Sequence, residues 1–170
     1  MRYICGHQDK WARSFEELSN YLYQYLSPHN KVHHVGSTSI AVMPAKDIID
    51  ITIATPSGQM SQLVEELAQA GYHHNGDQGI PGREAFHPNE GTPAANLAAH
   101  HLYACEAGAE ELHRHLSFRN YLRAHPARAQ WLANQKIQCD AQAATRSEYI
   151  ELKAASYTLI LEEALQWASA

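Results

Sequence analysis

The chain has few cysteines and no long run of apolar residues. Its three cysteines include no CxxC pair, a pattern typical of reduced thiols, so a cytoplasmic location is expected. No segment has the roughly 20 apolar residues needed to cross a bilayer. The first ten residues, MRYICGHQDK, lack the apolar core of a signal peptide. The sequence therefore predicts no membrane partner.

An excess of positive charge is also absent. Thirteen Lys and Arg stand against 18 Asp and Glu, which gives a formal net charge of −5. Because nucleic-acid-binding domains are usually basic, a nucleic-acid partner is not expected. The 170 residues are 45% hydrophobic and 18% charged, which suits one domain with a buried core. We predict a single domain over 1–170, with a sheet-containing part at about 1–107 and a helical part at about 108–170.

The periodicity of apolar residues predicts an α+β fold. In chain order we expect a helix at 11–26, strands at 31–36 and 47–54, a helix at 60–70, strands at 72–74 and 98–105, and helices at 110–124, 126–143 and 145–168. The breaker-rich run at 76–96 is interpreted as a long loop. These elements predict a small mixed β-sheet flanked by helices, followed by a helical C-terminal half.

The connection between the first two predicted strands carries the most chemistry. A Gly-Ser turn exposes backbone N–H groups and hydroxyls, so Gly36, Ser37 and Thr38 are candidates for binding phosphate oxygens. Lys46 adds a mobile positive charge. Asp50 is the candidate catalytic residue and Mg²⁺ ligand, since Mg²⁺ often takes one or two carboxylates plus substrate phosphates. The alternative is a polar turn that caps a helix, with Asp50 hydrogen-bonded inside the fold.

Five separated motifs resemble the GrpB family, also called UPF0157, of the nucleotidyltransferase-like superfamily. They are HVGSTSI, PAKDIIDI, GIPGRE, HHLYACE and HLSFRNYLRAHP. The resemblance implies a nucleotidyltransferase-like fold in which a Gly-Ser turn holds nucleotide phosphates. It also implies an acidic pair and a later acid that hold two Mg²⁺ ions. Gly36 and Ser37 match the Gly-Ser turn, and Asp50 matches the first carboxylate.

The sequence departs from that pattern at the metal ligands. Thr52 stands at the second carboxylate, and the later strand offers Tyr103 and no acid. Strand alternation places Asp50 and Thr52 on one face and Asp47 on the other. Because two-metal catalysis needs enough negative oxygens to hold both cations, a single Mg²⁺ or none is expected.

Three arginines are further ligand candidates. Arg83 lies in the glycine-rich turn GIPGRE and presents a fork of donors that suits phosphate, or else forms a structural salt bridge. Arg119 and Arg123 share one helix face and line the mouth of an anionic pocket, unless that face is merely solvated. Lys153 matches a lysine of the family, although solvent exposure is the usual fate of a lysine.

Histidine is over-represented, with 12 residues, several of them in adjacent pairs. The pairs at 33–34, 73–74 and 100–101 fall on predicted strands, so three neighbouring strands would gather three imidazoles as in a catalytic zinc site. The alternative is a polar sheet face along a cleft. No HExxH spacing is present. His34 and His101 are the preferred cleft members, as donors to an anionic ligand.

Three functions follow from these residues. The first is a transferase that moves a nucleotidyl or phosphoryl group of a nucleotide or small phosphorylated ligand, with Ser37 and Thr38 on the phosphates, Asp50 on Mg²⁺ and Arg83 balancing charge. The second is a non-catalytic module that binds the phosphorylated ligand without metal chemistry. The third is a histidine-based zinc hydrolase. The wide apolar face of the final helix also leaves room for a homodimer contact.

Overall fold

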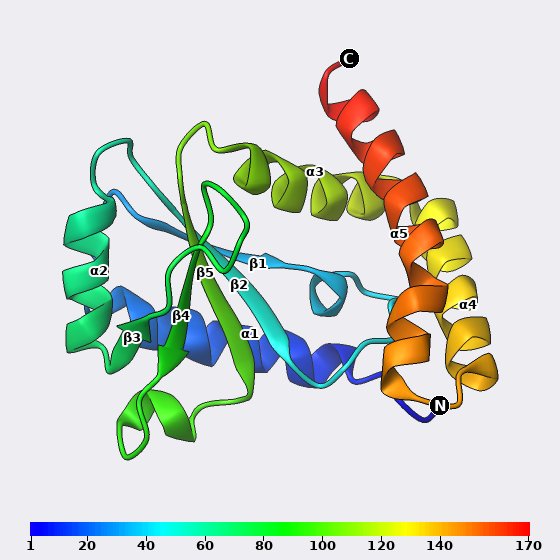
Figure 1. The fold of residues 1–170 in the computed structure, drawn as a ribbon, viewed down its shortest axis with the longest axis horizontal. Coiled ribbons are helices and arrows are strands. Elements are labelled where there is room, and N and C mark those ends of the chain that lie inside the picture. The colour runs from blue at the N-terminus through cyan, green and yellow to red at the C-terminus, as the bar shows by residue number, and fades with distance from the viewer.

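A computed structural model describes residues 1–170 (Figure 1) and contains one five-stranded sheet. The strands lie in the order β1-β2-β5-β4-β3. Their bounds are β1 Lys31–Val35, β2 Ile49–Thr55, β3 Tyr72–His74, β4 Glu84–Pro88 and β5 His100–Glu106. Only β2 and β5 pair in parallel, with Asp50 opposite His101, and the other neighbours are antiparallel. The sheet is therefore mixed, as the sequence predicts.

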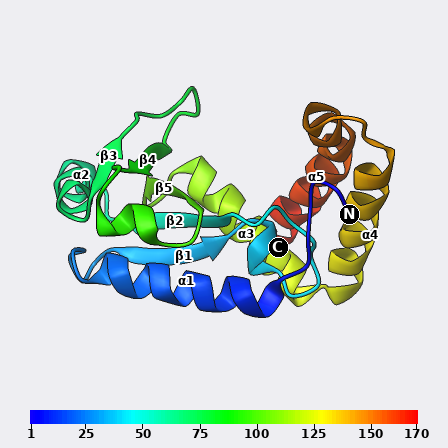
Figure 2. The ribbon, with the colours of Figure 1, turned by 90° about the horizontal axis from the view of Figure 1, so that it is seen from below.

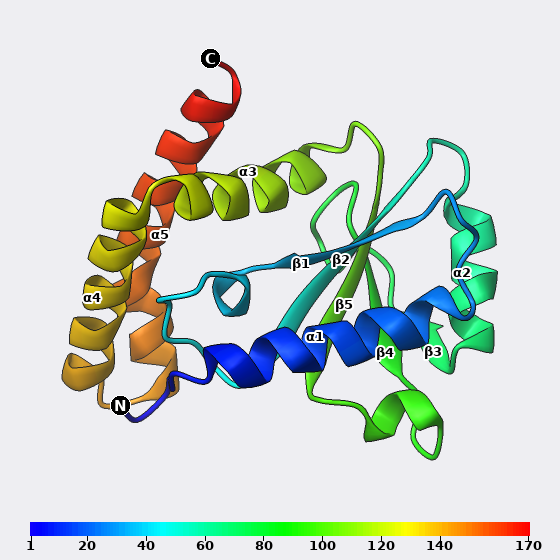
Figure 3. The same ribbon diagram turned by 180° about the vertical axis from the view of Figure 1, so that it is seen from behind.

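Five α-helices surround this sheet. They are α1 Gln8–Tyr23, α2 Met60–Gln69, α3 Glu110–Ala124, α4 Pro126–Gln142 and α5 Arg146–Ala168. Helix α1 runs along one face of the sheet (Figure 3), α4 and α5 stand together beyond one end of it, and α3 runs from the sheet to these two helices (Figure 2). Two short 3₁₀ turns, η1 Ser37–Ser39 and η2 Pro93–Asn96, complete the fold. No helix combines the length and apolar character needed to span a bilayer.

Side-chain alternation along β2 separates the core from the site. Ile49, Ile51 and Ile53 are buried in a cluster with apolar side chains of α1 and α2. Asp50 and Thr52 therefore point to the opposite face, where Thr52 bonds a side chain of α3. Asp47 lies on the α1 side, where it accepts a 2.9 Å hydrogen bond from the Trp11 ring. The predicted split of these acidic and polar residues between the two faces is confirmed.

A second apolar cluster fills the helical half. It is built by α3, α4 and α5 together with Ile40 and Met43, which follow the η1 turn. The N-terminal segment also packs here, because the amides of Arg2 and Tyr3 both donate 2.6 Å hydrogen bonds to the Asp140 carboxylate of α4. Both the segment that follows the η1 turn and the N-terminal segment are thus packed against the helical half.

The predicted loop at 76–96 is wrong in part, because it contains β4 and η2. Strand β4 has only a short apolar pair, Ala85 and Phe86, which is buried between β5 and β3. Two flanking strands supply its hydrogen bonds, so it forms without the longer alternation that sequence analysis requires. The first helix also begins and ends three residues earlier than predicted, at Gln8 and Tyr23.

Candidate functional site

A cleft lies between the sheet and the helical half. It consists of two adjoining cavities of about 250 Å³ and about 130 Å³. Four residues line both cavities: Ser37, Asp50, Lys136 and Lys153. These residues come from η1, β2, α4 and α5, so four separate elements build one site.

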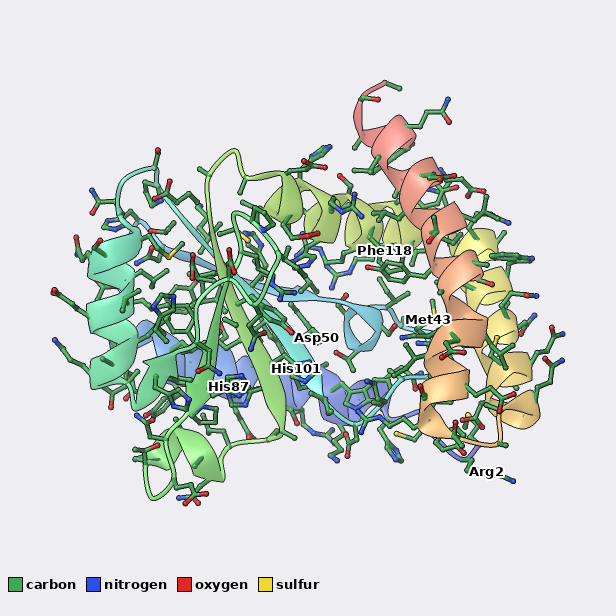
Figure 4. All side chains as sticks on the ribbon, in the orientation of Figure 1. Arg2, Met43, Asp50, His87, His101 and Phe118 are labelled. Atoms are coloured by element: carbon green, nitrogen blue, oxygen red, sulfur yellow. The ribbon has the colours of Figure 1, made fainter.

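The floor of the cleft is a close contact between a glycine and a carboxylate. Gly36 has φ of +68°, and a Cβ placed on it would lie 2.5 Å from Asp50 Oδ2. Glycine alone fits this turn without strain. The other carboxylate oxygen, Asp50 Oδ1, is 2.9 Å from His101 Nδ1 on the neighbouring strand. Figure 4 shows these two side chains next to each other on the sheet, with Phe118 towards the helical half. Asp50 therefore lies between the Gly36 turn and His101.

Lys136 projects from α4 onto the η1 turn. Its Nζ donates a 2.8 Å hydrogen bond to Ser37 Oγ, and its side chain is only 5% exposed. Burial, together with the positive charges of Lys153 and Lys46, lowers the pKa of Lys136 to about 7. The nearby Asp50 acts in the opposite direction without reversing the shift. This amine is therefore partly neutral at physiological pH.

Two more lysines surround the same turn. Lys46 lines the smaller cavity, and Lys153 of α5 lines both. Burial and the nearby Lys46 lower the pKa of Lys153. The sequence contains only five lysines, at positions 10, 31, 46, 136 and 153, and three of them converge on this cleft. Such an accumulation of like charge around one carboxylate favours an anionic ligand.

Arg83 closes the cleft from the β4 side. Its guanidinium lies 4.2 Å from the centre of the Tyr103 ring, a cation–π contact, and burial raises the pKa of Tyr103. The buried Nε of Arg83 has no hydrogen-bond partner, which leaves a donor available in the lining. No salt bridge joins Arg83 to an acidic side chain. Donation to an anion stays a prediction for this residue.

One wall of the larger cavity is apolar. Val35, Phe118, Leu132 and Tyr157 line it. The Phe118 and Tyr157 rings stack with their centres 4.6 Å apart, so α3 and α5 meet at this wall. The cleft thus combines a cationic end with an apolar wall, a combination suited to a small ligand that carries an anionic group on a carbon skeleton.

The residues do not fit a two-metal centre. Thr52 stands where a second carboxylate is required, and its Oγ1 is 2.9 Å from His115 Nδ1. Burial lowers the pKa of His115, so this imidazole is neutral. No group of three His, Cys, Asp or Glu side chains in the structure is arranged to hold a metal ion. Asp50 is the only carboxylate that lines either cavity.

Comparison with known proteins decides the family. The model of the GrpB protein family matches residues 3–163. The chain belongs to the GrpB family. It is 37% identical over 167 residues to the UPF0157 protein YqkA of Bacillus subtilis, covering 96% of this chain and 47% of YqkA. It is 33% identical over 127 residues to the glutamate-rich protein GrpB of Alkalihalophilus pseudofirmus, covering 72% of each. The resemblance drawn from the five motifs is confirmed.

Solved structures confirm the fold of this GrpB-family chain. The crystal structure of the conserved protein GrpB from Enterococcus faecalis superimposes with a TM-score of 0.79 at 31% identity, covering 98% of this chain and 99% of that one. The Cid1 poly(U) polymerase in its MgGTP-bound structure gives a TM-score of 0.51 at 13% identity, covering 78% of this chain and 42% of Cid1. The fold is nucleotidyltransferase-like, and at 13% identity the similarity to Cid1 concerns the fold alone. This chain spans about half the length of YqkA.

Two predicted site residues of this GrpB-family protein, Arg119 and Arg123, lie outside the cleft lining. Arg119 donates to the His34 carbonyl at 3.2 Å, and Arg123 donates twice to the Ser39 carbonyl at 3.1 and 2.9 Å. Neither arginine lines either cavity. They fasten α3 to the backbone around the η1 turn. The structure therefore does not bring them into the cleft lining, because the carbonyls of His34 in β1 and Ser39 in η1 accept their hydrogen bonds.

His34 also lies outside the cleft in which the sequence predicts it. Its ring stacks on Phe15 of α1, 4.6 Å between centres, on the core side of the sheet. His34 Nε2 lies 2.9 Å from Thr38 Oγ1, so the Thr38 hydroxyl is engaged although the residue lines the smaller cavity. Burial lowers the pKa of His34 to about 4. His101 lies on the cleft side, where it contacts Asp50 rather than lining a cavity.

The histidine pairs do not converge. Strand β2 separates β1 from β5, and β4 separates β5 from β3, so the three pairs lie on strands that are never adjacent. His74 instead pairs with Glu84 at 2.6 Å, and His73 stacks on His87. The zinc hydrolase prediction required three imidazoles at one point and is wrong for that reason.

Lys136 is the site residue that sequence analysis missed. It occupies the buried stripe of α4 together with Ala129, Leu132, Ala133 and Asp140. A lysine on a mostly apolar helix face is a recognisable signal, because a buried charge is costly unless it is paired. The sequence favours an exposed Lys153, whereas the structure places it in the cleft lining.

Proposed function

We propose that the cleft binds the phosphate groups of a small phosphorylated ligand, such as a nucleotide, and does so without a metal ion. The observation that carries the proposal is the convergence of Lys46, Lys136 and Lys153 on Ser37. Lysine ammonium groups and hydroxyl donors are the usual partners of phosphate oxygens. Arg83 adds a guanidinium with an unpartnered Nε. The ligand skeleton then rests on the apolar wall.

The charge balance supports metal-free binding. Two lysines and Arg83 line the cleft in addition to the partly neutral Lys136, against the single carboxylate of Asp50. A phosphate placed here is neutralised by the protein itself. Mg²⁺ would find only Asp50 and the ligand as charged oxygen donors, next to an excess of positive charge.

Charge removal at matched positions tests the proposal. We expect titration calorimetry with ATP and with pyrophosphate to give binding in EDTA. Lys46→Gln and Lys153→Gln should each weaken it about tenfold, the loss of one charge-assisted hydrogen bond. Lys31→Gln removes the same charge from an exposed position outside the cleft and should change the affinity less than about twofold. Absence of binding, or equal effects of all three substitutions, would contradict the proposal.

A transferase that moves a nucleotidyl or phosphoryl group is the second candidate. The position of Asp50 against the Gly36 turn favours it, since this carboxylate and the ligand phosphates could together hold one Mg²⁺. Asp50→Asn separates the two candidates by the sign of its effect. Metal-free binding should become tighter, because a negative charge leaves a site for anions. Mg²⁺-dependent binding should become weaker, and EDTA should abolish it.

Two further sequence predictions belong to this proposal. A cytoplasmic location is supported by the three unpaired cysteines, Cys5, Cys105 and Cys139. A homodimer through α5 is supported by its exposed apolar side chains, among them Leu159 and Trp167. Light scattering of the purified protein tests the second, with twice the 19.0 kDa chain mass as the expected result.

A further inference from the structure

We propose that Lys136 is a carbonyl-reactive amine, which forms a reversible imine with an aldehyde or ketone whose phosphate group occupies the cleft. The inference rests on the proposed phosphate site and narrows its ligand to phosphorylated carbonyl compounds. It is carried by the position of one amine, at the junction of the cationic end and the apolar wall.

The geometry provides an amine that is both shielded and reachable. Lys136 lines both cavities, and its only hydrogen bond is the 2.8 Å contact to Ser37 Oγ. The charged groups facing it are Lys153 of α5, Lys46 of the β1–β2 connection and Asp50 of β2. A ligand in either cavity therefore comes within reach of Nζ. A lysine on the protein surface would lack both the burial and the neighbouring cations.

The protonation state suits a nucleophile. With its pKa lowered to about 7, roughly half of Lys136 is the free amine at neutral pH, against less than about 0.1% of an ordinary lysine. Burial is the larger cause of this shift, ahead of the neighbouring cations. A phosphate bound by Lys46 and Lys153 offsets the effect of these cations and leaves the burial of Lys136 in place. Desolvation next to other cationic groups is an established way to activate a lysine towards carbonyl compounds.

The imine step balances without any further reactant. The Nζ lone pair forms a bond to the carbonyl carbon, and the carbonyl π pair moves to oxygen, which takes a proton from nitrogen. The resulting carbinolamine loses its hydroxyl group and the second N–H proton as water, which leaves a C=N bond. Ser37 Oγ, 2.8 Å from Nζ, is placed to carry the proton between nitrogen and oxygen.

The two ends of the cleft select the rest of the ligand. Lys46, Lys153 and Arg83 suit the phosphate, and Val35 and Phe118 of the apolar wall suit the carbon skeleton. A carbonyl group between these ends lies beside Lys136. A ligand lacking the phosphate would lose the cationic contacts and should react more slowly.

Reductive trapping tests the inference. Purified protein is incubated at pH 7 with stoichiometric pyridoxal 5′-phosphate as the probe, reduced with sodium borohydride and mapped by peptide mass spectrometry. We expect labelling of Lys136 to exceed that of the exposed Lys10 and Lys31 at least about tenfold, following the difference in free amine. Pyridoxal, which has no phosphate, should label Lys136 about tenfold less. In wild-type protein, labelling should reach half its maximum near pH 7.

Each alternative result is decisive. Labelling that spreads over Lys10 and Lys31 according to exposure, or a half-maximum near pH 10, would overturn the inference. Lys136→Arg keeps the charge and should lose the adduct, and retention of the adduct would also overturn it. If ATP binds but Lys136 is not trapped, the proposed phosphate site stands and only the imine is wrong. If pyridoxal labels Lys136 as well as its phosphate does and ATP fails to bind, the phosphate site is wrong instead.

Discussion

At the scale of single residues, the proposed role of Lys136 comes with an energetic penalty. Its pKa is about 7 in the folded protein and about 10.4 in an unfolded chain, so the unfolded chain binds more protons between these two values. Stability of the wild type therefore rises with pH across this window. The penalty of burying the charge is present in full below pH 7 and disappears towards pH 10.

Lys136→Met should accordingly stabilise the protein. We expect the free energy of unfolding at pH 7 to rise by about 2 to 4 kcal/mol, since the variant keeps the apolar stem and removes the buried charge. Urea denaturation at pH 6, 7, 8 and 9 measures it. The gain should be largest at pH 6 and 7 and should shrink at each higher pH. A variant that is less stable than wild type at pH 7 would contradict the shifted pKa of Lys136.

Gly36 imposes the second constraint at residue scale. A Cβ at this position meets Asp50 Oδ2 at 2.5 Å, and the φ of +68° is unfavourable for any L side chain. We expect Gly36→Ala to lower the free energy of unfolding by about 1 to 3 kcal/mol and to displace Asp50. The control is Gly58→Ala, which has a similar φ of +78° but meets no atom within 4 Å. Equal losses in the two variants would show that backbone strain alone acts at Gly36.

At the scale of elements, α3 is fastened to the η1 turn by its arginines. Arg123→Ala removes two hydrogen bonds to the Ser39 carbonyl, which should lower the free energy of unfolding by about 1 to 2 kcal/mol. Ligand affinity should change less than about twofold, because Arg123 lines neither cavity. Chemical denaturation and calorimetry with ATP measure the two quantities separately. A tenfold loss of affinity without loss of stability would restore Arg123 to the ligand site.

The arrangement of the elements explains which parts of the fold and of the site could be predicted from the sequence. Helices and most strands follow from local periodicity, and the Gly36–Ser37 turn and Asp50 lie within 15 residues of one another, so local pattern reveals them. Strand β4 depends on the hydrogen bonds of its neighbours, which no local pattern records. Lys136 lies 99 residues after Ser37. Tertiary packing brings Lys136 to that turn. The only local signal is its place on a mostly apolar face of α4.

At the scale of the whole molecule, the cleft joins two halves with separate apolar clusters. One cluster lies between the sheet, α1 and α2, and the other within α3, α4 and α5. The direct links between the halves include the Lys136–Ser37 bond and the two arginine contacts to backbone. A phosphate ligand would add contacts from Lys46 on one side and Lys153 on the other. Ligand binding should therefore stabilise both halves together.

Thermal unfolding measures that coupling. At a ligand concentration of 100 Kd the expected stabilisation is about 2.7 kcal/mol, which for a chain of this size raises Tm by about 5 to 10 °C. The unfolding should remain one transition, whether followed by tryptophan fluorescence or by far-UV circular dichroism. Lys153→Gln should reduce the shift at the same total concentration of pyrophosphate, and Lys31→Gln should leave it unchanged. Two transitions, of which only one moves with ligand, would mean that the ligand contacts one half alone, because a ligand held by Lys46 and Lys153 together must stabilise the elements that carry both.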